Sequence, residues 1–201
     1  ATRLTFKIHK ENYKMEVSVM EPKKFNTKTL ALIGVMTAVI CIMGPLSIQI
    51  PISPVPISLG TLAIYFAVYV LGMKKGIVSC LVYLLIGFVG LPVFSGFSSG
   101  PAKLLGPTGG YLIGYIFLAL ICGFVIDRTS NVFICFFGIL LGTAVLYLFG
   151  TVWLSYQGNM PFMKALAAGV LPFIAGDLVK IVIAIVAGDQ VKKQLKRAGL
   201  I

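Results

Sequence analysis

The feature that most constrains this chain is a series of six long apolar blocks. They cover residues 30–50, 57–72, 76–92, 111–126, 132–155 and 166–189, and segments rich in proline, glycine or charge separate them. Each block approaches the roughly 17–25 residues that an α-helix needs to cross a bilayer. Hydrocarbon offers the backbone no hydrogen-bond partners, so each block must satisfy its own N–H and C=O groups. The sequence therefore predicts an all-α integral membrane protein with six transmembrane helices.

The composition supports a membrane protein and excludes several other classes. Hydrophobic residues make up 58% of the chain and charged residues only 11%, whereas soluble domains carry about 25% charged residues. The net charge of +11 could suggest a nucleic-acid partner, but the basic residues cluster at the ends of the apolar blocks, as in membrane proteins. We therefore exclude an ordinary soluble enzyme, a disordered chain and a nucleic-acid-binding module.

The basic residues also predict the orientation in the membrane. With an even number of spans, both chain ends lie on one side, and that side collects ten lysines and arginines against two on the other. The positive-inside rule then places both termini in the cytoplasm. The two outer residues are Lys103 and Lys164; the ten inner ones are Lys23, Lys24, Lys28, Lys74, Lys75, Arg128, Lys192, Lys193, Lys196 and Arg197.

Residues 1–22 differ from the rest of the chain, because they mix acidic and basic residues and hold the only histidine, His9. They lack the apolar core and small-residue cleavage site of a secretory signal. We expect a leader or tag-like tail outside the fold, followed by a single six-helix membrane domain over residues 23–201.

Apart from charges at the interfacial ends of the blocks, only two charged residues fall inside a predicted span, Asp177 and Lys180. A charge at the bilayer centre costs roughly 2.5–3.5 kcal/mol on insertion scales, and such residues usually mark function. Spaced three apart, the two point to the same side of a helix. If that helix begins near Pro172, which suits a first turn, Asp177 lies roughly 8 Å deep. A structural ion pair that helps helices dock is the alternative.

An acidic and a basic group in an apolar pocket suit a small molecule with an apolar body. Asp177 would accept hydrogen bonds from an N–H-bearing head, and Lys180 would donate to a carbonyl or an anionic tail. The long outer segment 92–110 is typical of a lid or binding loop.

The sequence carries no nucleotide-hydrolysing motif. The nearest stretch, residues 96–103, has the wrong spacing for a phosphate-binding loop. No histidine lies within the apolar blocks, which disfavours a zinc protease or a Ser-His pair. We therefore predict no cofactor, no metal and no enzyme activity in the chain, and any energy for transport comes from partner subunits or an ion gradient.

Small residues recur at four-residue spacing in three places: Gly34 to Ala38, Gly106 to Gly110 to Gly114, and Gly138 to Gly142. Such spacing lets membrane helices approach closely, most often within one protein. The first pair lies near the predicted cytoplasmic end, where a partner subunit could dock.

Several specific strings carry a family resemblance. They are Gly90-Leu-Pro-Val-Phe-Ser-Gly96, Leu104-Leu-Gly-Pro-Thr-Gly-Gly-Tyr-Leu-Ile-Gly-Tyr115, Pro54-Val-Pro-Ile57 and Gly176-Asp177-x-x-Lys180. Over about residues 28–195 the chain resembles the BioY family, the biotin-specific S-components of energy-coupling-factor (ECF) transporters.

The resemblance implies the ECF S-component fold and a multi-pass subunit of the bacterial cell membrane that captures biotin from outside with high affinity. Its partners would be a membrane coupling subunit and two ABC-type ATPases, with Gly34 and Ala38 at the contact with the coupling subunit.

The resemblance also implies residue roles. Asp177 would accept from the ureido N–H groups of biotin, and Lys180 would donate to the ureido carbonyl or hold the valerate carboxylate. Tyr111 and the 95–100 backbone, with Gly96, Ser98 and Ser99, would close over the ring system.

The residues alone leave two other functions as alternatives. The first is a self-sufficient, proton-coupled secondary transporter for a small carboxylate or related vitamin, with Asp177 as the proton carrier. The second, which the missing catalytic groups disfavour, is a membrane-embedded enzyme that processes lipids or peptides.

Overall fold

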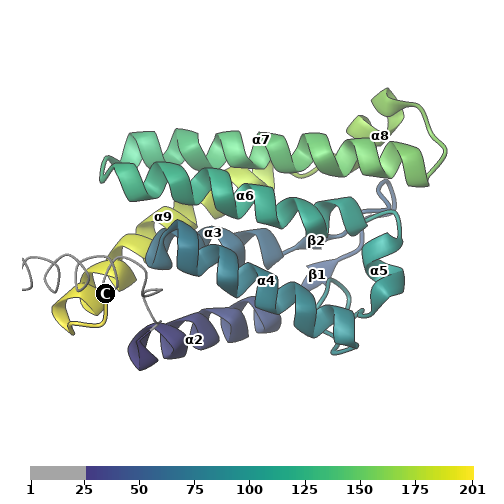
Figure 1. Cartoon of the computed structure of the whole chain (residues 1–201). Helices are drawn as coiled ribbons and strands as arrows, with labels where there is room; N and C mark the ends of the chain where they lie inside the picture. The colour runs from purple at the N-terminus through teal and green to yellow at the C-terminus, as the bar shows by residue number, and fades with distance from the viewer. Residues whose placement is uncertain (1–25) are drawn as a thin grey trace, which may run out of the picture.

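In the computed structural model, which describes residues 26–201, six long helices run alongside one another between two ends of the molecule (Figure 1). Two short helices and an antiparallel ribbon complete the described elements. The long helices are α2 (Thr27–Met43), α3 (Gly60–Leu71), α4 (Met73–Val89), α6 (Gly109–Arg128), α7 (Val132–Gln157) and α9 (Ile174–Arg197). The short elements are β1 (Ser47–Ile48), β2 (Ile57–Ser58), α5 (Pro101–Leu105) and α8 (Phe162–Gly169).

Each predicted apolar block overlaps one long helix, and the first and last blocks differ most from the structure. The first block was expected to run to residue 50, whereas α2 ends at Met43, before Gly44 and Pro45. Ser47 and Ile48 instead pair with Ser58 and Ile57 in the ribbon. The last block, predicted over 166–189, is broken between Gly169 and Ile174, with a bend of 49°. Helix α9 therefore begins at Ile174, close to the start near Pro172 that the sequence suggested. Pro172 lies in this break, and proline disfavours helical backbone in the residue before it.

The helices agree with a membrane protein without fixing the number of spans. By length and composition, α6 and α7 could each cross a membrane, and the bent pair α8–α9 could form a third span. Helices α2 and α3 are apolar but shorter. The predicted helical, apolar architecture is therefore confirmed, whereas the count of six spans remains a prediction.

The charges divide between the two ends as predicted. The α3–α4 junction, the α6–α7 connection and the end of α9 lie at one end, and α5, α8 and the ribbon lie at the other (Figure 1). Lys103 is in α5 and Lys164 is in α8, opposite the basic end of α9. Lys23, Lys24 and the predicted tail over 1–22 lie outside the described residues.

Glycines bring α6 and α7 into close contact, so the predicted small-residue stripes in these helices serve internal packing. An added Cβ at Gly110 would collide with Trp153, and one at Gly114 would lie 2.6 Å from Leu146. By contrast, Gly34 on α2 has nothing within 4 Å of its Cβ position.

Phe94 anchors the long loop between α4 and α6. Its ring is fully buried, packs edge-to-face on Tyr83 with centroids 5.5 Å apart, and fills the space beside Gly87. The backbone N–H of Gly100 donates to the carbonyl of Gly87 at 2.7 Å. Only glycine at position 87 lets this loop lie against α4.

We predict that Gly87→Ala destabilises the protein by about 1–3 kcal/mol, because its Cβ would overlap the buried Phe94 ring. Gly34→Ala is the matched control in another helix; it should leave stability unchanged or raise it by about 0.5–1 kcal/mol through helix propensity. Thermal unfolding in detergent compares the two variants, and equal midpoints would contradict this account of the loop.

Candidate functional site

An acid and an amine lie buried side by side at the start of α9. Asp177 and Lys180 are only 4% and 8% exposed, and the Nζ of Lys180 donates to Oδ1 of Asp177 at 2.7 Å. Asp177 sits in the first turn of the helix, where the helix dipole stabilises a negative charge. The two residues thus share one face, as their spacing predicted.

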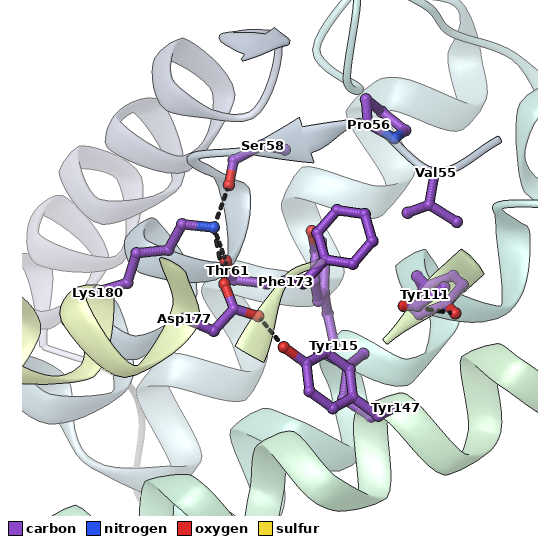
Figure 2. A pocket seen from close by; sticks show the side chains of 12 residues that line it. Val55, Pro56, Ser58, Thr61, Tyr111, Tyr115, Tyr147, Phe173, Asp177 and Lys180 are labelled. Atoms are coloured by element: carbon purple, nitrogen blue, oxygen red, sulfur yellow. Dashed lines mark hydrogen bonds and ion pairs between the residues drawn. The ribbon is translucent and has the colours of Figure 1, made fainter. Parts of the chain in front are cut away.

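Lys180 uses all of its donor capacity within the protein. Besides Asp177, its Nζ donates to the backbone carbonyl of Ser58 at 2.7 Å and to Oγ1 of Thr61 at 3.1 Å (Figure 2). An ammonium group has three donors. Any further acceptor must therefore replace one of these partners, and the Thr61 contact is the longest of the three.

Asp177, in contrast to Lys180, has an unused hydrogen-bond position. The Oη of Tyr147 donates to its Oδ2 at 2.6 Å, and Oγ1 of Thr61 lies 3.4 Å from its Oδ1. A carboxylate can accept about four hydrogen bonds, and three are accounted for between residues 26 and 201. One acceptor position, on Oδ2, is therefore available to another donor.

The pair borders a cavity of about 50 Å³ with mostly apolar walls. Figure 2 shows aromatic rings grouped beside the ion pair, contributed by α6, α7 and the turn before α9. A few polar groups within an apolar wall are typical of small-molecule sites. The lining residues are Val55, Pro56, Ser58, Thr61, Tyr111, Tyr115, Leu146, Tyr147, Gly169, Phe173, Asp177 and Lys180.

The ribbon sets the position of one Lys180 partner. The Oγ of Ser58 donates to the carbonyl of Gly44 at 3.1 Å and accepts from the N–H of Gly60 at 2.9 Å. These bonds fix the corner between β2 and α3, so the Ser58 carbonyl is held toward Lys180. Thr61 follows three residues after Ser58, in the first turn of α3.

The structure brings three of the predicted ligand-binding residues together. Asp177, Lys180 and Tyr111 all line the cavity, and the Oη of Tyr111 donates to the carbonyl of Gly169 at 3.0 Å.

The other three, Gly96, Ser98 and Ser99, are not among the lining residues. Their loop folds back on itself, since the Oγ of Ser98 donates to the carbonyl of Ser95. The N–H of Gly96 donates to the carbonyl of Pro45. Their contact with a ligand stays a prediction.

Sequence analysis missed Tyr147, Thr61 and Phe173. Tyr147 and Thr61 lie in apolar blocks among many similar residues, and nothing in the local pattern distinguishes them. Val55 and Pro56, in contrast, belong to the Pro-Val-Pro-Ile string that carried part of the family resemblance.

The predicted partner-contact residues lie apart from the cavity. Gly34 and Ala38 are exposed on one face of α2, together with Val35 and Ile42, which are 58% and 68% exposed. Within residues 26–201, no group of three or more His, Cys, Asp or Glu side chains could hold a metal ion.

We predict that Lys180→Met lowers the free energy of unfolding by about 3–5 kcal/mol, because it leaves the Asp177 carboxylate buried without its counter-charge. The double variant Asp177→Leu/Lys180→Met removes both charges and should recover at least half of that loss. Thermal unfolding in detergent gives the comparison. If the stability losses of the single variants Asp177→Leu and Lys180→Met simply add in the double variant, Asp177 and Lys180 are not coupled as described.

The chain is similar to proteins of one family. The BioY family model matches residues 16–197. The biotin transporter BioY of Thermotoga maritima is 34% identical over 160 residues, which cover 80% of this chain and 93% of that protein. The probable biotin transporter BioY of Pyrococcus horikoshii is 36% identical over 166 residues, which cover 82% and 96%.

A solved structure gives the same result. The S-component for biotin from an ECF-type ABC transporter superposes with a TM-score of 0.79 at 35% identity, and the match covers 86% of this chain and 95% of that one. The predicted S-component fold is therefore confirmed. On the family match, the two relatives and the shared fold, this chain belongs to the BioY family.

Proposed function

We propose that this protein captures biotin and serves as the substrate-binding subunit of an ECF-type ATP-driven transporter. The relatives are named biotin transporters, and the matching structure is an S-component for biotin. The observation that carries the proposal to this chain is the buried Asp177–Lys180 pair, which borders an aromatic cavity and leaves one carboxylate position available.

The chemistry of biotin suits this site. Its ureido group presents N–H donors, and the available position on Oδ2 of Asp177 accepts one of them. The apolar bicycle packs against the rings of Tyr111, Tyr115 and Phe173. Because Lys180 has no spare donor, it reaches the ureido carbonyl or the valerate carboxylate only by giving up a protein partner, and Thr61 is the one most readily replaced.

Ligand entry requires the site to widen. The cavity volume of about 50 Å³ is well below the roughly 300 Å³ at the lower end of small-molecule pockets. Two lining segments outside the long helices can move with little loss of helical hydrogen bonding: the residues before β2, with Val55 and Pro56, and the turn before α9. The bond from Tyr111 to the carbonyl of Gly169, the last residue of α8 before this turn, ties the start of the turn to α6, so we assign Tyr111 the role of closing the site.

We propose that the site opens to the outside of the cell. It lies at the end of the molecule that holds α5, α8 and the ribbon (Figure 1). That end carries Lys103 and Lys164, whereas the opposite end carries most of the basic residues, which favour the cytoplasm.

We predict that Asp177→Asn weakens biotin binding by at least about 100-fold, because an amide replaces a charged acceptor with a weaker one and adds a donor facing the ureido N–H. Lys180→Met should have a similar effect. Lys164→Met makes the same change at an exposed position and should bind as the parent does. Equilibrium binding of labelled biotin to the purified chain measures all three.

The double variant Asp177→Leu/Lys180→Met separates binding from folding. It is expected to fold yet not to bind biotin. Full affinity in Asp177→Asn and Lys180→Met would show that biotin binds elsewhere.

We propose that a membrane coupling subunit and two ABC-type ATPases supply the energy. The exposed face of α2 supports this contact, because Gly34 leaves open space and Ala38 adds only a methyl group. Small residues of this kind let a partner helix approach the backbone closely.

We predict that Gly34→Leu/Ala38→Leu abolishes co-purification with the coupling subunit and ATPases of the same organism, while biotin binding stays at the parental level. Ala144→Leu, at an exposed position on α7, is the control and should retain the complex. The chain alone should not concentrate biotin in proteoliposomes. Accumulation on a pH gradient without partners would favour the proton-coupled secondary transporter instead.

A further inference from the structure

A second cavity, of about 310 Å³, lies at the end of the molecule opposite the Asp177 site. It is formed where the ends of α3, α6 and α9 meet the start of α7. Its wall includes the hydroxyl-bearing residues Thr129 and Ser130 in the α6–α7 connection, and the ring of Tyr69. None of its lining residues borders the Asp177 cavity.

This cavity is basic. Three lysines line it, Lys192, Lys193 and Lys196, together with one acid, Asp189. Asp189 pairs with Lys193 at 2.6 Å. Within residues 26–201, Lys192 and Lys196 have no ion-pair partner, so the cavity keeps an excess of two positive charges that favours an anion.

An apolar groove of about 370 Å³ continues from the basic cavity. Val132 lines both, and the groove runs between α7 and α9 past Phe133, Phe137 and Val186. The same face of α9 carries both linings. Its residues Val182, Ile185 and Val186 are apolar, and one turn later Asp189, Lys192, Lys193 and Lys196 are charged.

We propose that this cavity and groove together form a binding site for an anionic phospholipid. The phosphate of the headgroup would accept hydrogen bonds from Lys192 and Lys196, and one acyl chain would lie in the groove between α7 and α9. Basic pockets between membrane helices bind acidic lipid headgroups in this way. The adjoining groove favours a lipid over a soluble phosphate, because only a lipid fills both halves of the site.

The test titrates the full chain in detergent with phosphatidylglycerol and measures bound lipid by native mass spectrometry. Phosphatidylglycerol is expected to bind more tightly than phosphatidylcholine with the same chains. Lys192→Gln/Lys196→Gln should weaken phosphatidylglycerol binding roughly tenfold or more and remove the preference between headgroups. Lys74→Gln/Lys75→Gln, which removes two charges from the same end without touching the cavity, should bind as the parent does.

Two further experiments distinguish a lipid from a soluble phosphate, and a folding control accompanies them. Glycerol phosphate, which has the headgroup chemistry without acyl chains, should not compete with the lipid at equal concentration. Val186→Trp fills the groove but leaves the lysines in place, and it should weaken binding of both lipids. Biotin binding, measured on every variant, should stay parental. Equal affinity for the two lipids, an equal loss in the Lys74/Lys75 control, or effective competition by glycerol phosphate would each overturn the proposal.

Discussion

The burial of one ion pair, Asp177 with Lys180, within an apolar bundle constrains how the elements around the candidate site are placed. Two buried charges lose several kcal/mol of hydration each, and only good geometry with further hydrogen bonds offsets that loss. The chain supplies these bonds from three other elements: Tyr147 on α7, Thr61 on α3 and the Ser58 carbonyl on β2. Each must be placed to within a hydrogen-bond length, so the ion pair couples the positions of helices far apart in the sequence.

The rest of the architecture explains how those positions are reached. Glycines at the α6–α7 interface draw the two helices together, and residues on their facing turns reach the cavity. The break after Gly169 places the start of α9, and hence Asp177, beside the ribbon. The site therefore lies where four long helices, the end of α8 and the ribbon meet. The second cavity is at the other end of α9, so one helix carries the buried Asp177–Lys180 pair at its start and the lysines of the basic cavity at its end.

Much of this could be predicted from sequence, for physical reasons. The apolar blocks predict helices because hydrocarbon offers the backbone no other hydrogen-bond partners. Asp177 and Lys180 are recognisable because charges are rare in such blocks. The ribbon was missed because it is a short feature inside apolar segments, whereas Pro172 did indicate where the last helix begins. Tyr147 and Thr61 could not be singled out, because their role depends on which neighbours the fold brings together. Gly96, Ser98 and Ser99 were placed at the site by resemblance; they do not line the cavity, and their contact with a ligand stays a prediction.

The most direct test of the central claim is an experimental structure of this protein with biotin bound. The account predicts a ureido N–H of biotin about 3 Å from Oδ2 of Asp177, with the bicycle against Tyr111 and Phe173 and the surrounding segments displaced to enlarge the cavity. Biotin bound at another place, with the Asp177–Lys180 pair and its cavity unchanged, would contradict it.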